Sequence, residues 1–162
     1  GCSPAELTWR SGVDILSFGA TKGGAFAAEA VVVFDLGLAE SLGYRRKRGG
    51  HLLSKMRLIA AQLEAYLEGG LWLRLAAQAN AQARRLGRAL EGRKGVSLLH
   101  PVEANMLFVS MAEPLAAALE AEGFRFYRWP SEDGLTVARL VTAFDTDPAS
   151  IDGLIAALDR HG

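Results

Sequence analysis

The stretch VDILSFGATKGG spans residues 13–24 and joins an apolar run to a turn of small residues. The run from Val13 to Phe18 is rich in apolar residues, which is typical of a strand buried on both faces. Lys22 follows in the turn, beside two glycines that leave space near its amine. A desolvated lysine amine is a good nucleophile and forms Schiff bases with aldehydes. The alternative is a lysine at the end of a strand that points into water.

Outward from this turn, the pattern alternates between strands and helices. A second apolar, β-branched run at residues 30–34 predicts another strand. Residues 3–12 have the pattern of a short helix, with Ser3 as its cap and a proline in its first position. Glycine pairs and apolar residues at helical spacing predict three further helices, at residues 38–48, 52–67 and 71–92.

The periodicity changes after Gly95. Apolar runs predict strands at residues 104–111, 124–129 and 136–144. Gly123 is placed to end a helix that begins at Pro114, and Asp147 followed by proline is a start signal for a last helix. This order predicts a small α+β sandwich, with helices on one face of an antiparallel sheet.

Composition excludes several classes of protein. The chain has 162 residues, of which 50% are hydrophobic, and 18 basic residues balance 18 acidic ones. A neutral chain has no overall field for nucleic acid or an anionic membrane, so we expect neither partner. The most apolar run, residues 24–38, is too short and too polar to span a bilayer, and no signal peptide is visible. A single cysteine favours a reducing, cytoplasmic compartment. Three histidines without ligand spacing predict no metal site.

Arg139 is the second candidate residue. It lies in the apolar run VARLVT at residues 137–142 and shares a strand face with Val137 and Val141. A guanidinium in such a strand needs an anionic partner, and its planar fork matches a carboxylate. The partner is either a ligand or a structural acid such as Glu103 or Asp145. An edge strand with Arg139 in water is the remaining alternative.

A basic segment, RRKR at residues 45–48, precedes two glycines and is followed by His51, Lys55 and Arg57. Clustered cations beside glycines are suited to holding a phosphate group. The alternative is a solvated helix face, which is the usual role of a charge run. Thr21 is a further candidate, since its hydroxyl could bind a phosphate or could cap the turn that contains Lys22.

Several stretches together resemble a known family, the low-specificity threonine aldolases and beta-eliminating lyases of the pyridoxal-phosphate-dependent fold type I. The stretches are DILSFGATKGG at 14–24, AEAVVVFD at 28–35, YRRKRGGHLLSKMR at 44–57, PVEANMLFVSM at 101–111 and VARLVTAFDT at 137–146. Their order is that of the C-terminal half of such an enzyme. The resemblance implies an α/β fold in which residues 1–70 belong to the cofactor-binding large domain. Residues 71–94 form the interdomain helix, and residues 95–162 form the small α+β domain.

The resemblance also implies a function. Lys22 matches the lysine that carries pyridoxal phosphate, and Arg139 matches the arginine that holds the substrate's α-carboxylate. Thr21, Arg48 and Lys55 are the candidates for the cofactor phosphate, with Arg57 as an alternative in the same segment. The implied reaction cleaves β-hydroxy-α-amino acids such as threonine to glycine and an aldehyde, in a homodimer or homotetramer. The alternatives are a related β-eliminating lyase or aminotransferase, or an inactive remnant that serves as a structural module.

The resemblance predicts that these 162 residues alone have no aldolase activity. The chain begins at Gly1, and we expect the aspartate that pairs with the cofactor's pyridine nitrogen, and the residue stacked on its ring, to lie upstream. Without the aspartate the cofactor ring is a poor electron sink, and without the stacked residue the plane of the ring is not held. The purified chain, incubated with pyridoxal phosphate and threonine, should release no aldehyde above the background of free cofactor. Turnover that depends on Lys22 would contradict this expectation.

Overall fold

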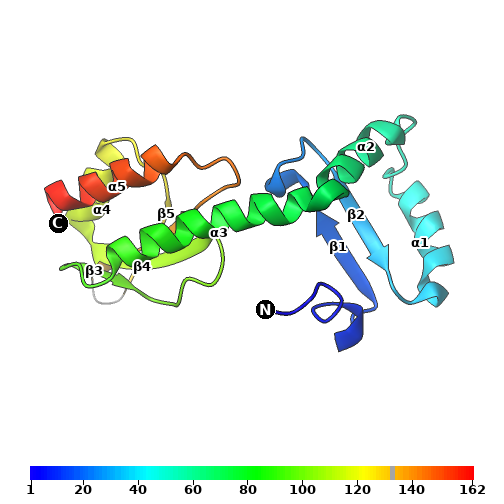
Figure 1. Ribbon diagram of the computed structural model, residues 1–162, viewed down its shortest axis with the longest axis horizontal. Helices are drawn as coiled ribbons and strands as arrows, with labels where there is room; N and C mark the ends of the chain where they lie inside the picture. The colour runs from blue at the N-terminus through cyan, green and yellow to red at the C-terminus, as the bar shows by residue number, and fades with distance from the viewer. Residues whose placement is uncertain (132–133) are drawn as a thin grey trace. The chain divides into compact units, whose positions relative to one another are not determined.

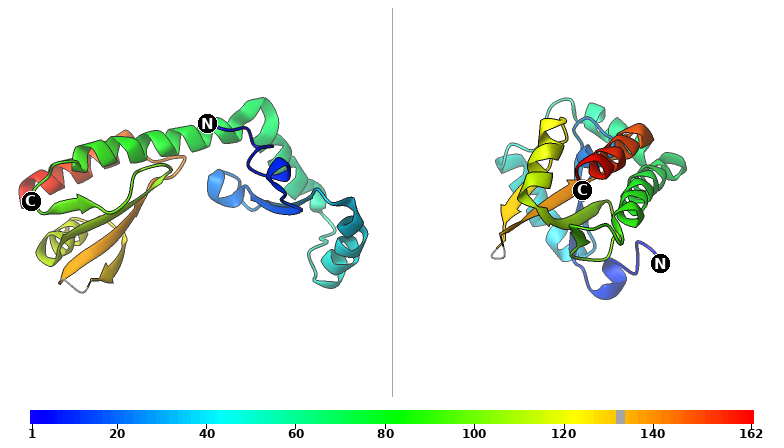
Figure 2. Two further views of the ribbon diagram at one scale, coloured as in Figure 1. Left: turned by 90° about the horizontal axis from the view of Figure 1, so that it is seen from below. Right: turned by 90° about the vertical axis from the view of Figure 1, so that its left-hand side faces the viewer.

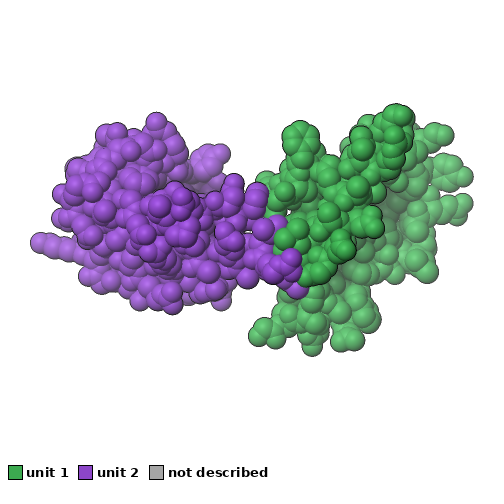
Figure 3. Space-filling model, turned by 45° about the horizontal axis from the view of Figure 1, so that its top comes forward, with its two compact units in different colours: residues 1–72 green, residues 73–162 purple. Residues whose placement is uncertain are grey.

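A computed structural model describes residues 1–131 and 134–162. The chain forms two compact units, Gly1–Trp72 and Leu73–Gly162, which Figure 3 shows in different colours. Figure 1 gives the order of the helices and strands. None of the helices in the described part of the chain is long and apolar enough to cross a membrane.

The first unit is built on two antiparallel strands, β1 (Ile15–Gly19) and β2 (Glu29–Val33), with Ile15 opposite Val33 and Gly19 opposite Glu29. Helix α1 (Leu36–Arg48) follows, and Asp35 caps it by accepting a hydrogen bond of 2.9 Å from the amide of Gly37. Helix α2 (Met56–Leu67) and a 3-10 turn, η3 (Glu68–Gly70), complete the unit. Gly69 has a φ of 56°, which explains why glycine ends the helix here.

Two expectations for this unit were wrong. Residues 3–12 form turns and a short 3-10 helix, η1 (Trp9–Ser11), rather than an α-helix. Ser3 does cap the first turn, but the hydroxyls of Thr8 and Ser11 bind nearby backbone carbonyls and compete with helical hydrogen bonds. The two strands are also not buried on both faces within the described residues. Every residue of the two strands is exposed or half-buried, and Val31 is 62% exposed.

The second unit contains a four-stranded antiparallel sheet in the order β3-β4-β6-β5. The strands are β3 (Val96–Leu98), β4 (Met106–Ala112), β5 (Tyr127–Pro130) and β6 (Leu135–Val141). The helices are α3 (Leu71–Leu90), of which the residues from Leu73 belong to this unit, α4 (Glu113–Ala121) and α5 (Pro148–His161). The expected α+β arrangement is confirmed (Figure 2). The three-residue strand β3 was not expected, because its apolar pattern is too short to detect.

One face of the sheet forms the core of this unit. Alternate residues of β6, namely Thr136, Ala138 and Leu140, are buried. Ala138 and Leu140 join one apolar cluster with buried residues of β4, α3, α4 and α5. The intervening residues, including Arg139, lie on the other face by the two-residue period of a strand. The sheet therefore has a helix-covered face and a face that the described helices leave open.

An ion pair on the covered side should make the stability of this unit acid-sensitive. Arg128 and Thr136 both donate hydrogen bonds to Glu113, and the Arg128 guanidinium is the main cause of the lowered pKa of that carboxyl. Because the pKa is lower in the folded chain, the pair contributes stability above the unfolded value of about 4.3. That contribution is lost as the pH falls through the lower, folded-state value.

The variant Glu113→Gln should therefore unfold more readily than the native chain at pH 7, and the difference should disappear at about pH 2. Urea unfolding followed by circular dichroism at both pH values measures this difference. Glu103→Gln is the control, since Glu103 is exposed and has no ion pair with any residue that the structure describes. A difference for Glu113→Gln that persists unchanged in acid would contradict the electrostatic explanation.

Candidate functional site

Lys22 lies in a short 3-10 turn, η2 (Thr21–Gly23), directly after β1. The turn is closed at its base, where the amide of Ala20 donates a hydrogen bond of 2.9 Å to the carbonyl of Ala28. Both alanines are almost completely buried. The hydroxyl of Thr21 accepts a 3.0 Å hydrogen bond from the amide of Ala28, so it helps to close the same loop. The backbone on each side of Lys22 is therefore held in place.

Two side chains of helix α2 contact the loop that contains this turn. The buried side chain of Tyr66 packs against Gly23, where a methyl group would overlap the tyrosine hydroxyl. The ring of Tyr66 also lies 6.2 Å from that of Phe18 on β1. One turn earlier on the helix, the side-chain oxygen of Gln62 accepts a 3.0 Å hydrogen bond from the amide of Ala27. Together, α2 and β1 determine the position of the loop that carries Lys22.

The side chain of Lys22 itself is exposed, and it has no hydrogen bond or ion pair with any described residue. The structure thus provides an amine on a held backbone, accessible to an aldehyde. The described residues do not supply the desolvation that would activate it.

The basic candidates belong to the same unit as Lys22. Arg48 is the last residue of α1, whose final turn also contains Arg45, Arg46 and Lys47. Lys55 occupies the cap position at the start of α2, and a helix N-terminus favours the binding of an anion. Arg48, Lys55 and Arg57 are all exposed. Within the residues described, none of these three is hydrogen-bonded or ion-paired to the Lys22 turn.

Arg139 lies in the second unit, on the open face of the sheet. Its cross-strand neighbours are Phe108 on β4 and Tyr127 on β5. The guanidinium carbon is 4.6 Å from the centre of the Tyr127 ring and 5.9 Å from that of Trp129. The Nε atom of Arg139 is buried without a hydrogen-bond partner among the described residues.

The structural ion pairs considered for Arg139 are not formed. Neither Glu103 nor Asp145 is paired with it in the part of the chain that the structure describes. The aromatic neighbours Tyr127 and Trp129 were missed by the sequence reasoning, although their two-residue spacing places both on one strand face. Tyr66 and Gln62 were missed as well, because helical periodicity does not reveal which loop a helix supports.

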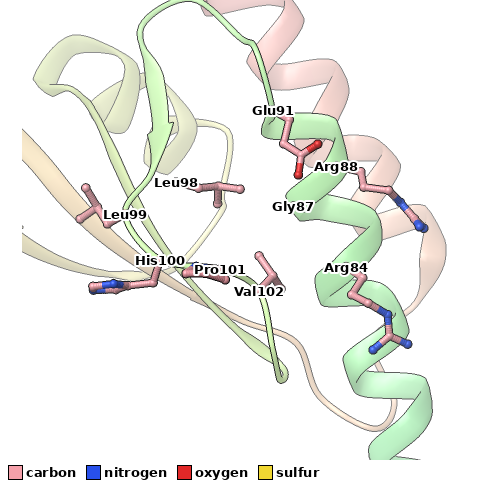
Figure 4. Close-up of a pocket in the computed structure, with 9 residues that line it drawn as sticks. All are labelled: Arg84, Gly87, Arg88, Glu91, Leu98, Leu99, His100, Pro101 and Val102. Atoms are coloured by element: carbon pink, nitrogen blue, oxygen red, sulfur yellow. The ribbon is translucent and has the colours of Figure 1, made fainter.

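A separate cavity of about 510 Å³ lies between α3 and residues 98–102. Figure 4 shows Glu91 directed toward that segment, whereas Arg84 and Arg88 extend away from it. Its polar groups do not converge, and none of the residues singled out above lines it. The described residues also contain no group of three or more His, Cys, Asp or Glu that could hold a metal ion.

Comparison with known proteins identifies the class of protein to which this geometry belongs. Residues 1–114 match the family described as beta-eliminating lyases, and the chain belongs to that family. The family depends on pyridoxal phosphate. The chain is 48% identical over 147 residues to a low specificity L-threonine aldolase of Pseudomonas aeruginosa, and 45% identical over 156 residues to another from a Pseudomonas species. These matches cover 91% and 96% of this chain but only 42% and 44% of the relatives.

Solved structures agree with this assignment. A threonine aldolase from Leishmania major is 29% identical, with a TM-score of 0.85, and the match covers 91% of this chain and 43% of that one. A serine palmitoyltransferase from Sphingomonas wittichii is 14% identical, with a TM-score of 0.66 over 93% of this chain and 40% of that one. The second likeness concerns the fold alone. The chain has the fold of the pyridoxal-phosphate-dependent enzymes of fold type I, as the resemblance implied.

The contact between Tyr66 and Gly23 predicts the effect of a small substitution. Gly23→Ala should destabilise the first unit by about 1–3 kcal/mol, because the added methyl overlaps the buried tyrosine hydroxyl. Gly43→Ala is the matched control, since Gly43 lies in exposed helix with nothing within 4 Å of the new methyl. It should stabilise the chain by up to about 1 kcal/mol. Urea unfolding followed by the fluorescence of Trp72, with the other two tryptophans replaced by phenylalanine, reports on this unit. Equal stability of Gly23→Ala and Gly43→Ala would exclude a tight contact between Tyr66 and Gly23.

Proposed function

We propose that this chain functions in a pyridoxal-phosphate-dependent lyase that cleaves β-hydroxy-α-amino acids such as threonine to glycine and an aldehyde. The observation that carries the proposal is the 48% identity to a low specificity L-threonine aldolase across 91% of the chain. The chain spans 42% of the length of that relative. The proposed activity is therefore that of a protein as long as the relative.

In this proposal, Lys22 is the residue that holds the cofactor, through its amine and the cofactor's aldehyde carbon. The residues present are suited to this role, because a primary amine without a partner among the described residues sits on a backbone held by Ala28, Gln62 and Tyr66. Bound pyridoxal phosphate supplies an electron sink for the bond that is broken at the substrate's α-carbon. Lys22 also bears the amine that the substrate's amino group displaces.

Thr21, Arg48 and Lys55 are proposed to bind the cofactor phosphate. Thr21 is adjacent to Lys22, and its hydroxyl is already directed at the loop by its hydrogen bond with Ala28. Arg48 and Lys55 bring positive charge to a helix C-terminus and a helix N-terminus of the same unit. Arg57, in the first turn of α2, remains the alternative to Lys55.

Arg139 is proposed to bind the α-carboxylate of the substrate. The support is its lack of a carboxylate partner in the described structure and its buried, unpartnered Nε atom. A guanidinium that is stacked on aromatic rings keeps its donors directed outward in the plane of the fork. A substrate carboxylate can therefore accept two hydrogen bonds from it.

The organisation of the chain follows from the same proposal. Residues 1–70 belong to the cofactor-binding domain, residues 71–94 form the interdomain segment, of which Leu71–Leu90 are the helix α3, and residues 95–162 form the small domain. We also propose a cytoplasmic homodimer or homotetramer. The support is a single, free cysteine and the exposed apolar side chains of the first unit, among them Phe26 at 93% and Leu36 at 81% exposure.

A related β-elimination is the second candidate activity, and the description of the matching family favours it. The two reactions break different bonds of the same substrate class, and both need Lys22. Aldol cleavage yields glycine and an aldehyde, whereas β-elimination yields a keto acid and ammonia. Product analysis separates them, and an absence of both activities would favour an inactive structural module.

The role of Lys22 predicts where the cofactor is attached. In a hybrid enzyme, this chain replaces the matching segment of the Pseudomonas aeruginosa relative. Borohydride reduction in the presence of pyridoxal phosphate, followed by peptide mapping, should place the label on Lys22. Lys22→Ala should abolish aldehyde release from threonine, while Lys94→Ala should leave it unchanged. Label on another lysine, or an active Lys22→Ala hybrid, would refute the assignment.

The role of Arg139 predicts a loss of affinity without a loss of fold. Arg139→Lys keeps the charge but loses the planar fork, so KM for threonine in the hybrid should rise about 30-fold or more. The melting temperature should change little, because Arg139 has no ion pair with a described residue. Initial rates and thermal unfolding of the same preparations test both statements. A variant that unfolds readily with an unchanged KM would show that Arg139 is structural.

A further inference from the structure

The open face of the sheet in the second unit surrounds Arg139 with aromatic side chains. Arg139 on β6 is directly opposite Tyr127 on β5, and Trp129 lies two residues further along the same strand. Directly opposite residues share a face of a sheet, as do residues two apart on a strand. On the other side, Phe108 on β4 is also opposite Arg139, and its ring packs against His100 at 5.7 Å. The side chain of Arg139 thus has aromatic neighbours on both adjacent strands.

The contacts on the β5 side are specific. The guanidinium carbon lies 4.6 Å from the Tyr127 ring centre and 5.9 Å from that of Trp129. The two rings are themselves nearly parallel, with an interplanar angle of 25° and centres 6.3 Å apart. The two distances from the guanidinium carbon to the ring centres are within the range of cation–π attraction. The rings therefore hold the guanidinium in one place without supplying an anion.

A neighbouring arginine of the same sheet is held by acidic side chains instead of aromatic rings. Arg128 lies between Tyr127 and Trp129 on β5, and its side chain is held by ion pairs to Glu113 and Glu120, the latter at 2.6 Å. Its hydrogen-bonding capacity is used within the fold. Arg139 is held by aromatic rings instead, so its capacity to bind an anion is retained.

We propose that Tyr127 and Trp129 are positioning residues that hold the Arg139 guanidinium ready for the substrate's α-carboxylate. This inference rests on the proposed function of Arg139. An unrestrained arginine has many rotamers and would lose conformational entropy when it binds a carboxylate. The aromatic rings restrict the side chain before the substrate arrives.

The test uses single variants of the hybrid enzyme defined above. Tyr127→Leu should raise KM for threonine about tenfold and leave kcat within about twofold. Trp129→Leu should have a smaller effect, because its ring is farther from the guanidinium. Tyr127→Phe keeps the ring and should restore the native KM. Trp9→Leu is the control, since it removes another arginine–tryptophan contact, at 5.1 Å, from a residue outside the proposed site.

A second measurement uses the 162-residue chain itself and needs no activity. A proton held over an aromatic ring resonates upfield, so the Nε–H signal of Arg139 should be shifted in a spectrum of ¹⁵N-labelled arginine side chains. The signal is assigned by its absence in Arg139→Lys. Tyr127→Leu should move it to the position of exposed arginines, and Tyr127→Phe should not. An unshifted signal in the native chain would overturn the inference.

The outcomes also separate this inference from the proposed function. If Arg139→Leu raises KM but Tyr127→Leu does not, the positioning role is wrong and the role of Arg139 stands. If Arg139→Leu leaves KM unchanged, the proposed function of Arg139 is wrong, and the positioning role falls with it. A fall in kcat at constant KM for Tyr127→Leu would also overturn the inference.

Discussion

The pleat of strand β6 is the constraint on which the second unit depends. Its alternate residues Thr136, Ala138 and Leu140 are buried on the helix-covered side, so Arg139 must lie on the other side. A shift of one residue in register would bury the guanidinium in the apolar core at great cost. The end of the strand is secured by Thr142, whose hydroxyl donates a 2.8 Å hydrogen bond to the carbonyl of Ala79 on α3. Core packing therefore determines where the proposed carboxylate-binding residue is presented.

A comparable dependence holds for the lysine turn of the first unit. The turn is closed by its own hydrogen bonds, and it is further positioned by β1 and by the helix α2 that follows much later in the chain. Tyr66 and Gln62 reach the loop from one face of that helix, one helical turn apart. The glycine next to Lys22 is required because the tyrosine hydroxyl occupies the space of a side chain. The chemistry proposed for Lys22 thus relies on a packing contact more than forty residues away in sequence.

The two arginines of β5 and β6 show how neighbouring cations acquire different roles. Arg128 is held by two glutamates on α4, and its positive charge lowers the pKa of Glu113. Arg139, on the other face, meets aromatic rings and no acid among the described residues. Sequence alone assigns the same chemical capacity to both guanidinium groups. Their surroundings commit one to the fold and leave the other able to bind an anion.

The sequence by itself determined the class of fold, the family resemblance and most of the helices and strands, because hydrophobic periodicity and glycine signals are local. It also singled out Lys22, which follows an apolar strand in a turn of small residues, and Arg139, which interrupts an apolar strand with a charge. It was wrong about residues 3–12, where side-chain hydroxyls compete with the helix, and it missed the short β3. Only the tertiary structure decided that Tyr66 packs on the lysine turn and that Tyr127 and Trp129 flank Arg139. The first contact joins segments more than forty residues apart, and the second depends on the register between β5 and β6; no local pattern specifies either.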